Sequence, residues 1–121
     1  MRDNSTTIKE LKEKVKKFCE ERDWDQFHNP KDLAIGISTE ASELLEIFRF
    51  KGKEEMKQIM SDPNKRQKVG EEVADVFYVL LRFAQINNFD LSDELDKKMK
   101  KNNEKYPIEK AKGSNKKYDE E

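Results

Sequence analysis

Apolar residues along this chain recur at intervals of three and four positions, with charged residues between them. That interval is the period of amphipathic α-helices, whereas strands alternate apolar and polar residues at every second position. Only 4 Gly and 3 Pro interrupt the pattern, and no segment shows the alternation of a strand. We therefore expect an all-α protein whose long helices form an antiparallel four-helix bundle.

Short signals place the ends of these helices. Thr7 and Glu10 have the form of a capping box, and Asn29 followed by Pro30 is typical of a helix start. Gly52 is expected to stop the second helix, and Pro107 the last one. The expected helices span about residues 7–23, 30–51, 54–60 and 63–87, and a last one runs from Asp90 or Ser92 to Tyr106.

The chain shows no internal repeat and no linker. We therefore expect one helical domain over residues 1–107. Residues 108–121 are rich in Lys, Gly, Ser, Asn and Glu, and are expected to form a polar tail.

Composition excludes several classes of function. The 25 Lys and Arg against 26 Asp and Glu give a net charge of −1, which argues against binding a nucleic-acid backbone. No uncharged apolar stretch approaches the roughly 18 residues of a membrane span, so we expect a soluble, cytoplasmic protein without membrane partners. One cysteine, Cys19, and one histidine, His28, exclude an internal disulfide and a histidine-rich zinc site.

Helical geometry directs two acidic residues inward and places two more at the edge of the same apolar stripes. At 100° per residue, Glu40 falls inside the apolar stripe of the second long helix and Glu43 falls on its border. Glu72 and Asp75 repeat this arrangement on the third long helix, at the same angles of about 300° and about 240° from an apolar reference residue. The two helices therefore present matching acidic pairs.

Two facing helices of a bundle would bring these four carboxylates into one small volume. Burying ionised carboxylates without partners is costly, and we expect no Lys or Arg on the same stripes to neutralise them. An all-oxygen set suits Mg²⁺ first and Mn²⁺ second, with open positions for phosphate oxygens. The alternative is that the acids are solvated surface; a di-iron site is disfavoured because His28 lies in a connection.

The sequence also resembles a known family. Glu40-Ala41-Ser42-Glu43 followed by Glu72-Val73-Ala74-Asp75 resembles the E-x-x-E, E-x-x-D signature of the MazG-type all-α nucleoside triphosphate pyrophosphohydrolases. Further stretches over roughly residues 8–118 resemble the dCTP pyrophosphatase branch of that family: residues 22–30, Phe48-Arg49-Phe50-Lys51, Lys98-Met99, Asn102, Lys105-Tyr106-Pro107 and Lys117-Tyr118.

The resemblance implies Mg²⁺-dependent attack of water on the α-phosphorus of a nucleoside triphosphate, which yields a nucleoside monophosphate and pyrophosphate. Glu40, Glu43, Glu72 and Asp75 would be the catalytic residues and hold the metal. A carboxylate that is not fully engaged with the metal would accept the proton of the attacking water. Glu43 is our choice for that general base.

Substrate contacts are also implied. Lys98 and Asn102 share one face of the last long helix and would reach phosphate or sugar oxygens. Trp24 and Phe50 match family positions that flank the base, where aromatic faces stack on nucleobases. The full expected set is Trp24, Phe50, Lys98, Asn102, Lys105 and Tyr106.

Three departures from the branch affect the expected substrate. Phe50 stands where the branch has tryptophan, and Val15 stands where it has histidine. Val79 occupies the place of a tyrosine, while the neighbouring Tyr78 points about 100° away from it around the helix. We therefore expect dCTP or modified dCTP first, and broad house-cleaning of deoxynucleotides second. His28 is interpreted as a capping or packing residue.

The third long helix has a wider apolar surface than one partner needs, and Phe77 and Leu81 point away from Glu72. This pattern predicts a homodimer or, as the family's pattern suggests, a homotetramer, with sites that two chains build together. Two non-catalytic alternatives stay open: a metal-dependent nucleotide sensor and a helical oligomeric adaptor. A measurement of nucleotide hydrolysis distinguishes both alternatives from the enzyme.

Overall fold

The computed structural model describes residues 1–115 and confirms the all-α class, because the described residues form helices and no strand. No helix in this part of the chain is long and apolar enough to cross a membrane. In chain order the elements are α1 (Ile8–Glu21), the 3-10 turn η1 (Asp25–Phe27), α2 (Pro30–Phe48), α3 (Lys53–Ser61), α4 (Pro63–Ile86), α5 (Leu91–Lys105) and α6 (Ile108–Ala111).

Side-chain caps start the four longest helices. Thr7 makes both hydrogen bonds of a capping box at the start of α1. Asn29, Asp62 and Asp90 each accept a hydrogen bond, at 2.8 to 2.9 Å, from the backbone N–H three residues later. Because these bonds satisfy donors that the first helical turn leaves free, they fix where each helix begins. Asp90, rather than Ser92, caps α5.

The second long helix ends earlier than predicted, at Phe48 rather than near Lys51. Lys51 N donates to Phe48 O at 3.0 Å and closes a turn, in which Arg49 has φ −56° and ψ 134°. Phe50 follows with φ +64°, a left-handed conformation that residues other than glycine rarely adopt. Gly52, which the sequence predicted to stop this helix, instead caps α3.

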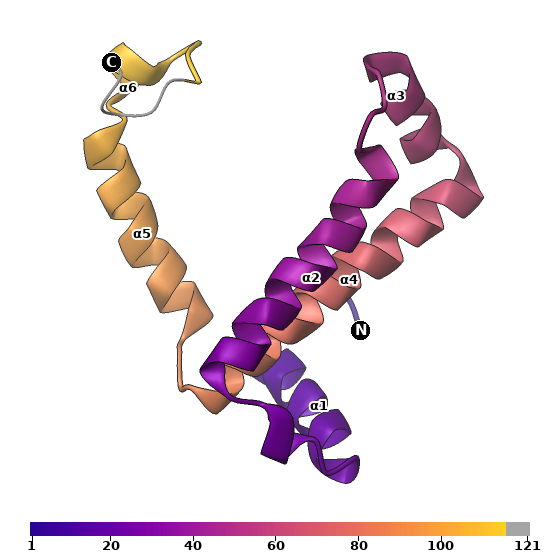
Figure 1. Cartoon of the computed structure of the whole chain (residues 1–121). Helices are drawn as coiled ribbons and strands as arrows, with labels where there is room; N and C mark the ends of the chain where they lie inside the picture. The colour runs from indigo at the N-terminus through magenta and orange to yellow at the C-terminus, as the bar shows by residue number, and fades with distance from the viewer. Residues whose placement is uncertain (116–121) are drawn as a thin grey trace. The chain divides into compact units, whose positions relative to one another are not determined.

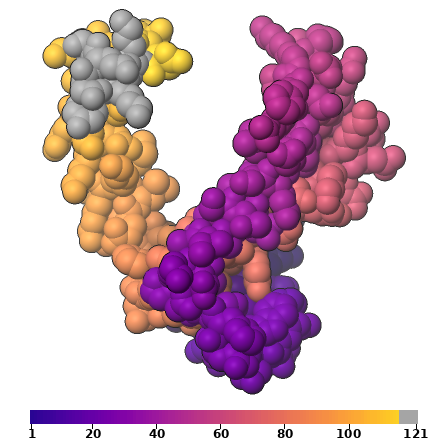
Figure 2. All heavy atoms as spheres, in the orientation of Figure 1, coloured from indigo at the N-terminus to yellow at the C-terminus, as the bar shows by residue number. Residues whose placement is uncertain are grey.

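Two compact units make up the chain, Met1–Asn88 and Phe89–Glu121. In the first unit α4 packs against α1, α2 and α3, most extensively against α2 (Figure 1), and the atoms of α2 lie in front of part of α4 on the face shown in Figure 2. Its buried apolar residues are Cys19, Leu33, Ile59, Val69, Leu81 and Ala84. The second unit contains α5 and α6, and α6 lies inside the segment predicted to be a polar tail. The four-helix bundle and the domain boundary at residue 107 stay predictions.

The apolar surface of α4 is covered partly within the chain. Leu81, which the projection directed toward a second chain, is only 3% exposed, so that prediction was wrong for this residue. Three helices of the same unit, α1, α2 and α3, contact α4, so more of its surface is covered within the chain than the projection allowed for. Val73, Phe77 and Leu80 remain exposed at helical spacing and form the outward apolar stripe of α4.

A buried arginine ties the η1 connection to α4. Arg82 is 2% exposed, and its Nε donates to His28 Nδ1 at 2.9 Å. Its other guanidinium nitrogens pair with Asp25 and donate to Gln85 Oε1 at 2.6 Å. Burial lowers the pKa of His28, and the adjacent Arg82 charge lowers it further, while Asp25 opposes both. His28 therefore packs as an acceptor in this network, in agreement with its interpretation as a packing residue.

Helices α2 and α4 approach each other closely at Gly36. A Cβ atom at this position would lie 3.2 Å from Val79 Cγ1, tighter than ordinary van der Waals contact. Gly70, on α4, offers a contrast, because a Cβ there would meet nothing within 4 Å. Among the glycines that the structure describes, Gly36 is the one where the helix pairing leaves little room for a side chain.

We predict that acid weakens the fold through His28. Its folded pKa lies below the ordinary 6.5, so the unfolded chain binds the proton more readily, and the free energy of unfolding falls as pH drops through that value. NMR titration of the single histidine will measure the pKa. Denaturant unfolding at pH 7.5 and 5.5 should show a larger loss for the native chain than for His28→Gln, which keeps an acceptor for Arg82. A histidine pKa at or above 6.5 would contradict the network.

We also predict opposite outcomes for two glycine substitutions. Gly70→Ala should raise the free energy of unfolding by about 0.5–1 kcal/mol, because alanine loses less backbone entropy in a helix. Gly36→Ala should show no such gain, because the new methyl meets Val79. In a Val79→Ala background the gain at position 36 should return. Equal stabilisation by both substitutions in the native chain would refute the close approach.

Candidate active site

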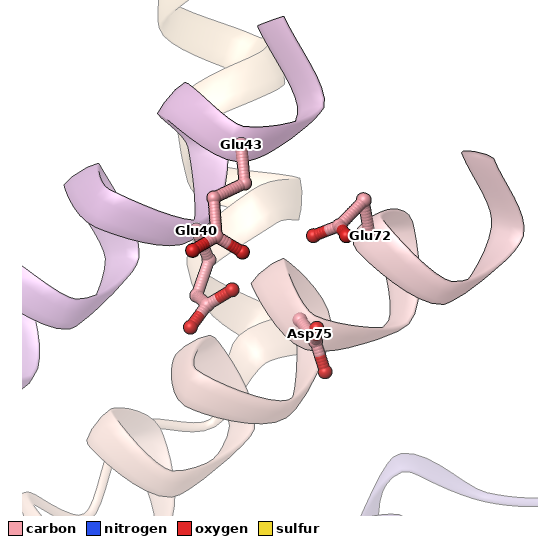
Figure 3. A group of neighbouring side chains, drawn as sticks. All are labelled: Glu40, Glu43, Glu72 and Asp75. Atoms are coloured by element: carbon pink, nitrogen blue, oxygen red, sulfur yellow. The ribbon is translucent and has the colours of Figure 1, made fainter. Parts of the chain in front are cut away.

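Four carboxylates meet between α2 and α4. Glu40 and Glu43 come from α2, and Glu72 and Asp75 come from α4 (Figure 3). One oxygen atom from each residue lies within 4.8 Å of the chosen oxygen of every other residue. The structure thus brings together the two acidic pairs that the helical projection placed inside and at the edge of the apolar stripes.

The cluster has a buried side and an open side. Glu72 is 5% exposed and Glu40 is half-buried, whereas Glu43 and Asp75 are exposed. The Oε2 atoms of Glu40 and Glu72 are buried and have no hydrogen-bond partner among the described residues. Because a buried oxygen without a partner is costly, these two atoms favour a bound cation.

One lysine contacts the cluster, which corrects the expectation that no Lys or Arg lies near it. Lys68 Nζ is 2.8 Å from Glu72 Oε1. The signal was present in the sequence, because Lys68 lies at about 260° on the projection, between Glu72 and Asp75. Its side chain is largely exposed, so it neutralises one of four acidic charges and leaves the cluster negative.

The buried acids respond to their surroundings in opposite directions. Burial raises the pKa of Glu40, and the neighbouring carboxylate of Glu43 raises it further. The hydrogen bond from Lys68 lowers the pKa of Glu72, and the same contact raises the pKa of Lys68. Glu72 is thus held as an anion, while ionised Glu40 requires additional positive charge.

The donor set fits a hard divalent cation. All four groups are carboxylates, and neither His28 nor Cys19 belongs to the cluster. Mg²⁺ and Mn²⁺ prefer such oxygen ligands and keep positions open for substrate oxygens, which matches an exposed side beside a buried one.

A mainly apolar pocket of about 440 Å³ adjoins the acids. Its volume lies within the range of small-molecule sites, which is about 300–1,000 Å³. Asp75 belongs both to this pocket and to the carboxylate cluster. Trp24, predicted to flank the base, is one of its walls. The pocket is lined by Lys14, Val15, Phe18, Trp24, Asp75 and Tyr78.

Sequence reasoning missed Phe18 and Lys14 as pocket residues. Lys14 and Phe18 are four residues apart on α1, and Phe18 follows Val15 by three, so one face of that helix could have been proposed from the projection. Tyr78 also lines the pocket, with its hydroxyl 3.3 Å from Cys19 Sγ. Burial raises the pKa of Tyr78, and the contact with Cys19 raises it further. No local pattern connects Cys19 with Tyr78.

Phe50 is not among the residues that line this pocket. Its side chain is 90% exposed, and the Arg49 guanidinium lies 4.8 Å from the centre of its ring. The structure therefore does not bring the two predicted base-flanking residues, Trp24 and Phe50, together within one chain.

The remaining predicted substrate contacts lie in the second compact unit. Lys98 and Asn102 are one helical turn apart on α5, Lys105 ends that helix, and Tyr106 follows it. The backbone N–H of Tyr106 donates to Asn102 O at 2.8 Å. These four roles stay predictions, and the Lys117-Tyr118 stretch lies outside the described residues.

Comparison with known proteins agrees with the sequence motifs. A model of the MazG-like family matches residues 35–120. Curated relatives include dCTP pyrophosphatase 1 of Mus musculus, which is 33% identical over 112 residues, covering 93% of this chain and 66% of the relative. The Homo sapiens protein of the same name is 33% identical over 114 residues, covering 94% and 67%. This chain thus spans about two thirds of the length of these relatives.

A solved structure gives the same result for the fold. The crystal structure of a pyrophosphatase from Archaeoglobus fulgidus DSM 4304 superposes with a TM-score of 0.78 at 32% sequence identity. The match covers 88% of this chain and 98% of the archaeal one. With the family model matching most of the chain and the two acidic pairs facing each other between α2 and α4, this chain belongs to the MazG-like family.

Proposed function

We propose that the protein is a Mg²⁺-dependent nucleoside triphosphate pyrophosphohydrolase, which converts a (deoxy)nucleoside triphosphate and water into the monophosphate and pyrophosphate. The observation that carries the proposal is the meeting of four carboxylate oxygens within 4.8 Å beside an apolar pocket. The names of the relatives, dCTP pyrophosphatase 1 and a pyrophosphatase, support it.

Glu40, Glu43, Glu72 and Asp75 would hold the metal, with Mn²⁺ as a substitute for Mg²⁺. When bound, such a cation would supply positive charge that neutralises phosphate oxygens and lowers the pKa of the attacking water. Glu40 and Glu72 each carry a buried oxygen without a hydrogen-bond partner among the described residues, and they are therefore proposed to anchor the inner side of the cluster.

Glu43 is the proposed general base. Its side chain is exposed, in contrast to the buried or half-buried carboxylates of Glu72 and Glu40, so water can reach it. It accepts a proton from the water that attacks the α-phosphorus, and the pyrophosphate departs from the opposite side of that phosphorus. Lys98, Asn102, Lys105 and Tyr106 are proposed to bind phosphate and sugar oxygens.

The nucleobase would occupy the pocket beside Asp75, where Trp24 offers an aromatic face for stacking. We place dCTP and modified dCTP first among substrates, in line with the names of the curated relatives. Hydrolysis of several deoxynucleotides is the second candidate, because Val15 lines the pocket and gives the base no hydrogen-bonding side chain. Either specificity would remove unwanted nucleotides from the cellular pool.

We propose a homodimer or a homotetramer that assembles through the exposed stripe of Val73, Phe77 and Leu80. Phe50 is almost fully exposed in its own chain and would reach the base site of a second copy. Such an arrangement would build each substrate site from two chains.

Reaction products test the activity directly. With Mg²⁺ and a panel of deoxynucleoside triphosphates, ³¹P NMR should show monophosphate and pyrophosphate only. Glu43→Gln should lower kcat by about 100-fold to 10,000-fold, because proton transfer in the transition state is lost. Glu46→Gln is the matched control, since this acid lies on the same helix, is exposed and pairs with Arg49. Diphosphate with orthophosphate would overturn the mechanism; absence of turnover with either metal would favour a sensor or adaptor.

Metal binding should be visible without substrate. At a Mg²⁺ concentration about ten times the dissociation constant, the free energy of unfolding should rise by about 1.4 kcal/mol, measured by thermal and denaturant unfolding. Glu40→Gln should lose this gain and, without metal, be at least as stable as the native chain, because it removes one repelling charge. Glu46→Gln should keep the full gain. An equal Mg²⁺ response in all three proteins would place the metal elsewhere.

A further inference from the structure

The aromatic walls of the pocket form one connected group. The ring centroids of Phe18 and Trp24 are 5.6 Å apart, and those of Phe18 and Tyr78 are 5.8 Å apart, both edge to face. The Phe18 ring therefore contacts each of the other two rings, and a movement of either outer ring changes the shape of the pocket.

Cys19 is hydrogen-bonded to both Tyr78 and Trp24, the residues on either side of Phe18. Its side chain is fully buried, and its Sγ lies 3.3 Å from the Tyr78 hydroxyl. Its backbone oxygen accepts a hydrogen bond from Trp24 N at 3.1 Å. A single residue at the end of α1 thus holds Tyr78 through its side chain and Trp24 through its main chain.

The turn that carries Trp24 depends on the same carbonyl. Arg22 N also donates to Cys19 O, at 3.2 Å, and Asp23 has φ +53°, a left-handed conformation. A non-glycine residue keeps such a conformation only where its neighbours hold it. The position of the Trp24 ring is therefore set by the chain reversal that begins at Cys19.

The contact between Cys19 and Tyr78 also determines which polar groups of the pocket can contact a ligand. Because the Tyr78 hydroxyl is engaged by the thiol, Tyr78 contributes its ring to the wall. Charged groups reach the pocket only from Lys14 and Asp75 among the described lining residues. A planar ligand ring would thus be held by shape and stacking against aromatic faces.

We propose that Cys19 is a positioning residue for the nucleobase, which sets the spacing of the Trp24 and Tyr78 walls and thereby the affinity for the substrate ring. The proposal rests on the pyrophosphohydrolase function proposed above. It assigns no chemical step to the thiol, which is free and buried.

Trp24 provides the measurement, because it is the only tryptophan of the chain. Its fluorescence should change on titration with Mg²⁺ and the α,β-imido analogue of dCTP, which cannot be cleaved between those phosphates. Cys19→Ala and Tyr78→Phe should each raise the dissociation constant, and KM for dCTP, about fivefold, the effect of losing one neutral hydrogen bond. The kcat value should stay within about twofold, since neither residue touches the reacting atoms.

Two further variants separate positioning from general stability. Cys19→Ser keeps a group that can bond to the Tyr78 hydroxyl, and it should restore most of the affinity. Ile59→Ala truncates a buried side chain on α3, away from the pocket lining, and should lose stability without losing affinity. The double variant Cys19→Ala with Tyr78→Phe should be no weaker than either single variant.

Unchanged affinity in Cys19→Ala, equal weakness of Cys19→Ser and Cys19→Ala, or additive losses in the double variant would each overturn the proposal. Cleavage of dCTP with no response from Trp24 would overturn it while leaving the proposed function standing. A response from Trp24 that depends on Cys19, without cleavage, would support the positioning role and reject the proposed function.

Discussion

Repulsion among four carboxylates is the constraint around which the first unit is built. Glu40, Glu43, Glu72 and Asp75 lie on facing sides of α2 and α4, and Lys68 compensates only one of their charges. Apolar packing has to hold the helices together against this repulsion. The close approach at Gly36 and Val79 lies one helical turn from the acids, and it keeps the two backbones near each other where the charges oppose it.

Local rules predicted most of the helices and the acidic cluster. Thr7 and Asn29 mark helix starts by side-chain caps, which depend on a few neighbouring residues and can be read directly from sequence. The inward direction of Glu40 and Glu72 followed from helical phase alone, because both lie within long, strongly periodic helices. The end of α2 was misplaced because the left-handed backbone of Phe50 has no signature in a residue other than glycine.

Features that depend on distant contacts were beyond such rules. Cys19 and Tyr78 are 59 positions apart, and only the packing of α1 on α4 makes them neighbours. Leu81 was assigned to a partner because a projection shows which side of a helix is apolar, but not how many helices of the same chain cover it. The contact of Lys68 with Glu72 differs from these cases. The helical projection already placed Lys68 between Glu72 and Asp75, so this contact could have been predicted from the sequence.

Two acids of the cluster and one aromatic wall of the pocket lie on α4, and this fixes the distance between them. Asp75 and Tyr78 are three residues apart on that helix, which separates them by about 4.5 Å along its axis. Arg82, one turn further on, fastens the η1 connection that follows Trp24 to the same helix. The Tyr78 wall of the pocket and the α4 acids of the cluster therefore lie at fixed positions along one helix, so the geometry of α4 sets the distance between them.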